Sequence, residues 1–225
     1  MDDSVTIKEK MINTVAEKKV LAGSFRVLVP LYITYIIFSL SIFIIFIPQQ
    51  EKQLLDQKKE TIQQLTEGAL SLLAEINSRV TRGEITIKEA HIDAKNLVRY
   101  LRYGPEGKDY FWINDMYPSM IMHPYRPDLN GKDLTTFKDP AGNYPFVAMV
   151  ETVKKNKGGF VNYYWQWKDE PQKIVLKISY IKEFLPWGWI VGTGIYLDDI
   201  NKEIKLITQK FLHIFAVILI FIVIL

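Results

Sequence analysis

A lysine in the middle of an apolar strand is the residue in this chain that packing explains least well. Alternation along residues 173–180 places four side chains on one face of the strand and four on the other: Lys173, Val175, Lys177 and Ser179 against Ile174, Leu176, Ile178 and Tyr180. Lys177 then either points to solvent or needs an anionic partner, because a buried unpaired charge is costly. A pocket for a short organic anion needs one fixed cation, two or three hydrogen-bond donors and an apolar wall. Lys177 is therefore a candidate anion anchor, and Ser179 on the same face is a candidate contact.

Three further residues near the predicted strands could complete such a pocket. His123 precedes Pro124, which favours an extended backbone and so fixes where the imidazole points. Its ring could donate a hydrogen bond to a ligand oxygen and add charge near its usual pKa of about 6.5, although a structural role explains it nearly as well. Arg102 is a candidate second cation, but the end of a surface helix also accounts for it. Met122 fits either an apolar pocket wall or the core.

Two short predicted strands contain more aromatic residues than one core needs, namely Tyr110, Trp112, Tyr163, Tyr164 and Trp165. Aromatic rings that carry a hydroxyl or an indole N–H can wall a pocket and hold a ligand oxygen at the same time. Alternation separates Tyr110 and Trp112 from residues 111 and 113, so one pair faces the helices and the other the pocket. We predict Tyr110, Trp112 and Tyr164 as pocket residues, with plain packing as the role of the others.

The elements that must position these residues follow from a change in sequence periodicity. Five segments are short, rich in aromatic or β-branched residues, and bounded by Pro, Gly, Asn and Asp: 109–114, 119–123, 159–167, 173–181 and 187–195. One helix is predicted over 144–155, between the second and third of these segments. Helices that precede a run of strands at hairpin spacing indicate an α+β domain with an antiparallel sheet.

The helices at the start of the domain have two distinct signals. Apolar residues recur at spacings of three and four: Leu55, Ile62, Leu65, Ala69, Leu72, Ile76 and Val80. This stripe predicts one long helix that packs on its own domain, on a second copy of the chain, or on both. Thr86 and Glu89 form a capping-box pattern, which predicts the start of a second helix.

The glycines near the end of the domain are predicted to have a structural role in the last strand. Gly192 and Gly194 lie in the last strand, where the absence of a side chain permits close approach of neighbouring groups. A final helix is expected from Leu197, and Asp198 and Asp199 suit its first turn, where negative charge is favourable. Movement in this strand would reach the final helix directly.

Two apolar runs frame this domain. Residues 27–47 comprise 21 residues without a charged side chain, long enough as a helix to cross a hydrocarbon core of about 30 Å. Residues 211–225 are predicted to form a second, incomplete crossing. Lysines and arginine in residues 1–26 favour a cytoplasmic location for that segment. The expected organisation is a cytoplasmic segment (1–26), a transmembrane helix (27–47), an extracytoplasmic domain (48–210) and a truncated second transmembrane helix (211–225).

Composition narrows the classes of function. The net charge is +3, with 28 basic and 25 acidic side chains interspersed, which gives no sign of a nucleic-acid partner. The chain contains no cysteine, so disulfides, thiolate zinc sites and thiol nucleophiles are excluded. Sequence motifs of hydrolases, metalloproteases and phosphate-binding loops are also absent from it. We therefore expect no enzymatic activity within this chain, no metal and no cofactor.

Eight short motifs together resemble single Cache sensor domains in order and spacing. They are Tyr110–Asp115, Met122–Pro124, Asn130–Asp133, Asp139–Gly142, Gly158–Val161, Tyr163–Trp165, Lys177–Tyr180 and Trp187–Tyr196, within a match from Leu54 to Ile200. The resemblance implies a long N-terminal helix packed on a PAS-like antiparallel sheet, with a small-molecule pocket on the other face. It also implies ligands such as acetate, propionate, pyruvate or lactate. Because the matching motif includes Lys177, the resemblance favours its role as the anion anchor.

The resemblance also implies where and how the chain works. Such domains are extracytoplasmic ligand-binding modules of bacterial and archaeal chemoreceptors, sensor histidine kinases and cyclic-dinucleotide enzymes. We predict a multi-pass receptor of the plasma membrane, with a homodimer formed through the long N-terminal helix. A methyl-accepting chemotaxis protein is the favoured class. The alternatives are the input domain of a histidine kinase or cyclase, and a module that binds a partner protein instead of a small ligand.

Overall fold

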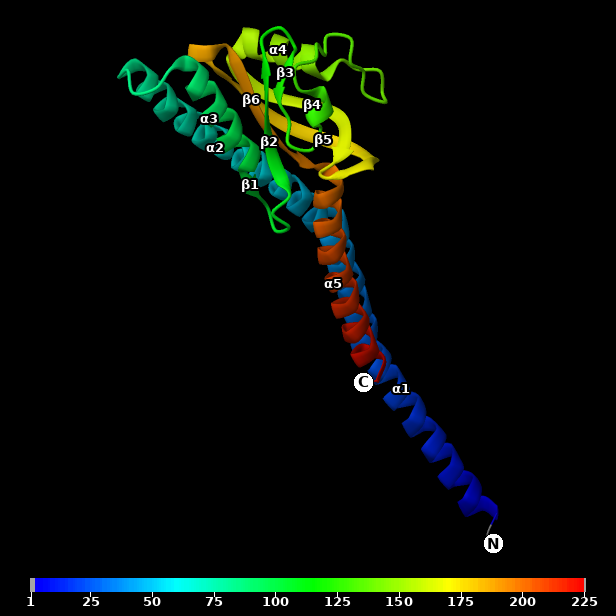
Figure 1. The fold of residues 1–225 in the computed structure, drawn as a ribbon. Coiled ribbons are helices and arrows are strands. Elements are labelled where there is room, and N and C mark those ends of the chain that lie inside the picture. The colour runs from blue at the N-terminus through cyan, green and yellow to red at the C-terminus, as the bar shows by residue number, and fades with distance from the viewer. Residues whose placement is uncertain (1–2, 225) are drawn as a thin grey trace. The chain divides into compact units, whose positions relative to one another are not determined.

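The computed structural model describes residues 3–224 of the chain (Figure 1). Met1 and Asp2 of the predicted cytoplasmic segment, Leu225 of the second apolar run, and the side chains of residues 3–9, 12, 15 and 20–24 lie outside the description. Contacts divide the chain into two units, one made of residues 1–51 and 204–225 and the other of residues 52–203. Helices α2 (Ile47–Thr81) and α5 (Leu197–Ile224) contribute residues to both units.

The first unit consists of helices with long apolar stretches. Helix α1 (Asp3–Ser41) continues into the π-helical segment η1 (Ile42–Phe46) and the start of α2, and α5 supplies the partner helix. The Tyr35 hydroxyl donates to the backbone carbonyl of Phe215 at 2.9 Å, and the Phe215 ring contacts those of Phe38 and Phe43. Two helical stretches, Phe25–Thr81 and Leu197–Ile224, are long and apolar enough to cross a membrane. They include residues 27–47 and 211–224 of the two predicted crossings, and their many exposed large apolar side chains suit a lipid environment.

The second unit is built on one antiparallel sheet. Its described strands follow the order β1-β2-β6-β5-β4, and β3 pairs with β2. The strands are β1 (Arg102–Tyr103), β2 (Asp109–Asp115), β3 (Met120–Met122), β4 (Gly158–Trp167), β5 (Glu170–Phe184) and β6 (Trp189–Tyr196). Two 3-10 turns, η2 (Pro127–Leu129) and η3 (Leu185–Trp187), lie in the connections. All five predicted strands form, which confirms the α+β class with an antiparallel sheet.

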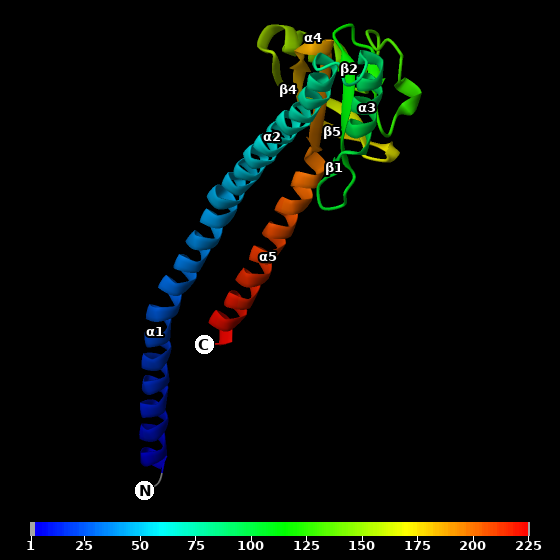
Figure 2. The same cartoon turned by 60° about the vertical axis from the view of Figure 1, so that its left-hand side comes forward.

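Helices α2 and α3 (Ile87–Tyr100) cover one face of the sheet, and α3 lies against β2 (Figure 2). The predicted capping box is present, since the Thr86 hydroxyl accepts from the Glu89 N–H at 3.2 Å and the Glu89 carboxylate accepts from the Thr86 N–H at 2.8 Å. The core on this side joins Ala69 and Leu73 of α2 to Phe111 and Ile113 of β2. Burial of apolar surface at roughly 25 cal/mol per Å² makes this layer a main source of stability.

Helix α4 (Pro145–Asn156) covers part of the opposite face. Its residues Phe146 and Met149 join a second core with Tyr110 and Trp112 of β2. The structure thus separates residues 110 and 112 from residues 111 and 113 as the alternation predicts. The candidate site lies on this side of the sheet, next to the second core.

Candidate functional site

Lys177 lies in the centre of the sheet, on the face that α4 partly covers. It belongs to β5 and pairs with Tyr163 on β4 and with Tyr196 on β6. The side chain is 1% exposed. Its ammonium nitrogen lies 4.0 Å from the centre of the Tyr110 ring, 4.9 Å from that of Trp112 and 5.0 Å from that of Tyr196. The solvent-facing interpretation of Lys177 is therefore wrong.

The Lys177 ammonium makes no hydrogen bond and no ion pair with any residue that the structure describes. Burial lowers its pKa to about 7, and the Asp109 carboxylate opposes this by raising it. Cation–π contacts with three rings compensate part of the lost hydration but supply no counter-charge. A buried cation that lacks an anion is a ready acceptor for one, because pairing would relieve the cost of desolvation.

Side chains that carry hydroxyl groups lie on the same face of the sheet as Lys177. The Tyr163 and Ser179 hydroxyls lie 3.1 Å apart, and both residues are buried. The Tyr196 hydroxyl lies 3.5 Å from that of Tyr110. Burial raises the pKa of Tyr110, Tyr163 and Tyr196, so all three remain neutral and able to donate.

His123 is also buried beside these rings, 4.9 Å from the Tyr110 ring centre and 5.6 Å from that of Trp165. Its Nδ1 accepts from the backbone N–H groups of Tyr125 at 3.2 Å and Arg126 at 2.9 Å. The proton of the neutral ring therefore lies on Nε2, which is a donor. Burial, and then the nearby Lys177 charge, lower the His123 pKa well below its usual value. The expectation that His123 adds charge is corrected to a neutral donor.

Trp165 belongs to this cluster although the sequence interpretation did not select it. The residue is 4% exposed, and its indole N–H has no hydrogen-bond partner among the described residues. Its ring packs against Tyr163 and Phe146 of the same core. The Trp112 indole N–H, by contrast, donates to Asn114 at 3.2 Å, so Trp112 contributes a wall and no free donor. The sequence could have indicated this position for Trp165, because residues two apart in a strand, such as Tyr163 and Trp165, lie on the same face.

The structure places three predicted site residues elsewhere. Tyr164 is 40% exposed and alternates away from Tyr163. Met122 is buried in the core between the sheet and helices α2 and α3. Met120, on the same strand, faces the Lys177 side instead. A register shift between β2 and β3 produces this exchange, which alternation alone does not show. The Arg102 guanidinium donates to the carbonyls of residues 99 and 101, so it serves the end of α3.

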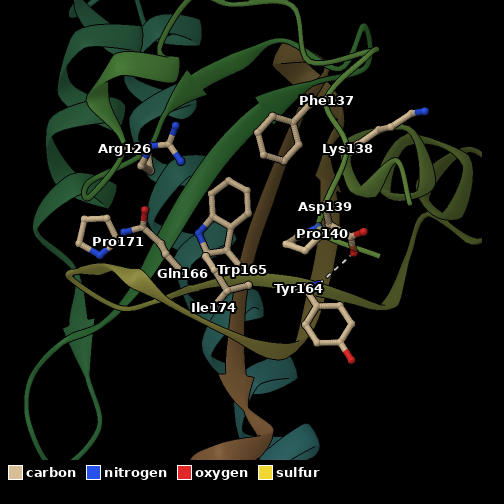
Figure 3. Close-up of a pocket in the computed structure, with 10 residues that line it drawn as sticks. All are labelled: Arg126, Phe137, Lys138, Asp139, Pro140, Tyr164, Trp165, Gln166, Pro171 and Ile174. Carbon is tan, nitrogen blue, oxygen red and sulfur yellow. Dashed lines mark hydrogen bonds between the residues drawn. The ribbon is translucent and has the colours of Figure 1, made fainter. Parts of the chain in front are cut away.

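A hollow of about 350 Å³ opens on the outer side of Trp165 (Figure 3). Its lining residues are Arg126, Phe137, Lys138, Asp139, Pro140, Tyr164, Trp165, Gln166, Pro171 and Ile174. Figure 3 shows the Tyr164 hydroxyl directed away from Trp165, while its backbone N–H donates to Asp139 at 3.1 Å. Trp165 thus belongs both to this hollow and to the core around Lys177. In the part of the chain that the structure describes, no group of His, Asp and Glu is arranged to hold a metal ion.

The fold defines a class of protein, an α+β domain with long helices on one face of an antiparallel sheet and a buried lysine on the other. Residues 54–210 match the family model described as Single Cache domain 2. The match covers more than half of the chain, and the chain belongs to this family. The resemblance inferred from the eight motifs is confirmed, and so is the Cache fold.

Comparison with known proteins agrees with this assignment. The chain is 38% identical over 160 residues to the methyl-accepting chemotaxis protein McpP of Pseudomonas putida, covering 71% of this chain and 29% of McpP. It is 30% identical over 153 residues to the sensor histidine kinase MctS of Rhizobium johnstonii, covering 68% of this chain and 32% of MctS. A solved structure described as "Structural basis for carboxylic acid recognition by a Cache chemosensory domain" is 39% identical, with a TM-score of 0.60, and covers 64% of this chain and 97% of that one. The chain spans about a third of the length of the curated relatives it matches.

Proposed function

We propose that this chain is the input part of a transmembrane receptor and that its Cache domain binds a small carboxylic acid. The observation that carries the proposal is the Lys177 ammonium, which is buried and has no anionic partner within ion-pair distance among the described residues. Sensing of this kind needs no catalysis. The ligand only has to bind two conformations of the domain with different affinity.

The groups around Lys177 suit a short acid of the acetate, propionate, pyruvate or lactate type. One carboxylate oxygen would pair with the Lys177 ammonium, and the other would accept from neutral donors such as the Trp165 N–H or the His123 Nε2–H. Hydrogen bonds to a charged group contribute about 1.5–3 kcal/mol each when buried. Tyr110 and Trp112 would wall the site, and Ser179 would hold its hydroxyl partner Tyr163 in place.

The receptor class rests on the relatives. McpP is a chemotaxis protein and MctS is a sensor histidine kinase, so both output types accompany this kind of domain. We favour a methyl-accepting chemotaxis protein because McpP is the more similar of the two. Residues 48–210 would then be extracytoplasmic and residues 1–26 cytoplasmic, with crossings in the two apolar helices.

Dimerisation through α2 forms part of the proposal. Ile62, Ala69 and Ile76 of the predicted stripe are buried within the chain, so they serve their own domain. Leu72 is 44% exposed on the same helix and is the stripe residue best placed to meet a second copy. A dimer seam would therefore be narrower than the sequence pattern indicates.

The proposal is tested by titrating the full chain in detergent micelles with the sodium salts of acetate, propionate, pyruvate and lactate by calorimetry. We expect binding of at least one acid. The matching amides, which have the same size but no charge, should not bind. Binding of an amide as tight as that of its acid, or no binding across the panel, would contradict the anion site.

A further inference from the structure

A second buried lysine, Lys168, lies at the turn between β4 and β5 and is 3% exposed. Three carboxylates from separate parts of the chain lie within 4 Å of its ammonium nitrogen. Their oxygens are at 3.3 Å (Glu106), 3.6 Å (Asp199) and 3.8 Å (Asp109). Such a buried ion cluster is stable only when its charges stay paired.

The three carboxylates link Lys168 to different elements. Glu106 lies in the connection between β1 and β2, and Asp109 is the first residue of β2. Asp199 lies in the first turn of α5, where the helix dipole favours a negative charge. The Trp167 indole N–H also donates to Asp199 at 3.2 Å. The start of α5 is therefore held to the end of β4 and to the β4–β5 turn by two contacts that share the Asp199 carboxylate.

The backbone of Lys168 reaches toward the acid-binding cluster. Its φ of 51° is in the left-handed region, which a residue with a side chain adopts only where its surroundings hold it. The Lys168 N–H donates to the Tyr196 hydroxyl at 3.0 Å. Tyr196 also lies under the Lys177 ammonium and is the residue immediately before α5. One tyrosine thus contacts the lysine of each cluster.

We propose that Lys168 is a positioning residue that ties the first turn of α5 to the Lys177 cluster and transmits the binding of an acid to that helix. The tie is read directly from the contacts, and the transmission rests on the proposed function. Asp109 lies 3.8 Å from Lys168, and its charge also acts on Lys177. An acid held by Lys177 would repel Asp109, strengthen its pairing with Lys168 and change the balance of contacts on Asp199. Helix α5 would receive this change at Tyr196 and Asp199 together.

Amide hydrogen exchange of the full chain in detergent micelles, measured by mass spectrometry for residues 197–203, tests the tie without any ligand. In Lys168→Met and Asp199→Asn we expect exchange there about tenfold faster than in wild type. Lys173→Met is the matched control, because Lys173 lies 4.0 Å from the Trp167 ring but makes no ion pair among the described residues. Unchanged exchange in both test variants would overturn the proposal. If Lys168→Met does not fold, Asp199→Asn, which keeps side-chain size, decides the outcome.

A second arm tests transmission with the panel acid that binds wild type most tightly. We expect that acid to change exchange at 197–203 in wild type and in Lys173→Met. In Asp199→Asn it should bind within about threefold of the wild-type affinity and leave this exchange unchanged. A response that persists in Asp199→Asn would overturn transmission, as would a wild type that binds without any change at α5. If no panel acid binds wild type, the proposed function fails, while the ligand-free arm still decides the tie.

Discussion

Two lysines are buried in the same domain, and their surroundings are opposite. Lys177 has aromatic rings and hydroxyls around it and no carboxylate within ion-pair distance among the described residues, whereas Lys168 has three carboxylates. Lys168 therefore has its counter-charges supplied by the fold, and its burial holds segments together. Lys177 has its counter-charge missing, and its burial costs stability.

This difference separates a structural ion cluster from the proposed binding site better than burial alone does. A protein retains an unpaired buried charge where function requires it, because replacement by an apolar residue would be favourable otherwise. The donors nearest to Lys177 are neutral, so they add no competing positive charge. The same domain thus contains one buried lysine whose charge is paired by carboxylates and one whose charge is not.

The largest expected effect comes from replacing each lysine by methionine. Lys177→Met should weaken acid binding by about 100-fold or more, since the charged partner is lost, while raising the free energy of unfolding by roughly 1–3 kcal/mol. Lys168→Met should lower the free energy of unfolding by roughly 2–3 kcal/mol, because its carboxylates lose their partner. Calorimetric titration and urea unfolding at pH 7 measure these changes. A lower stability of Lys177→Met than of wild type would show that the two sites do not differ in this way.

A smaller effect is expected from Gly194→Ala on β6. A methyl group there would clash with the Ser179 hydroxyl oxygen and would lie 2.7 Å from the Ile178 carbonyl oxygen and 2.9 Å from Cε of Lys177, so both the strand and the lysine would have to move. We expect acid binding to weaken by about 10-fold to 50-fold, with some loss of stability. Gly68→Ala on α2 is the control, because nothing lies within 4 Å of the added methyl group, and it should stabilise the helix by about 0.5–1 kcal/mol. Wild-type affinity in Gly194→Ala would show that the position of Lys177 does not matter.

The sequence predicted the fold and the face of the sheet on which Lys177 lies, because both depend on short patterns. Strand alternation put Lys177 and Ser179 on one face, and local capping signals placed the start of α3 at Thr86. These features are decided within a few residues of each other, so they can be read without knowing the tertiary structure.

The remaining site residues depend on how distant strands meet. Tyr163 shares the face of Lys177 because the two residues are paired across β4 and β5, and the sequence does not give that register. The shift between β2 and β3 likewise decides that Met122 faces the helices. Lys168 is buried by segments about 30 and 60 residues away in the sequence, so no local pattern marks it.

The pH dependence of binding gives a sharper test of the proposed site at Lys177. The Lys177 pKa is lowered to about 7, so the ammonium form that pairs with an acid is mostly present below pH 7 and is lost as pH rises above it. Affinity should therefore fall about tenfold between pH 6 and pH 8. The His123 pKa is well below its usual value, so His123 stays neutral through this range and does not contribute. Titrations with acetate at each pH check this, and an affinity that rises with pH would contradict a cationic anchor.

The same pKa shift has a consequence for stability without ligand. Because the folded-state pKa of Lys177 lies below its usual value of 10.5, folding favours the neutral amine. The contribution of Lys177 to the free energy of unfolding should thus increase as pH rises from about 7 to 10.5, and Lys177→Met should remove this part of the pH profile. Urea unfolding of both proteins from pH 6 to 10 measures the difference between their profiles. Parallel profiles would contradict an unusual pKa for Lys177.

The smallest effect distinguishes two adjacent tyrosines. Tyr163→Phe removes a buried hydroxyl that contacts Ser179, so acid binding should weaken by roughly threefold to tenfold, equivalent to about 1 kcal/mol. Tyr164→Phe removes a hydroxyl that Figure 3 shows directed away from Trp165, and binding should stay within about twofold of wild type. Both variants keep the ring, so packing changes little and the hydroxyl alone is tested. If Tyr164→Phe weakened binding more than Tyr163→Phe, the ligand would lie in the outer hollow beside Trp165 instead of next to Lys177.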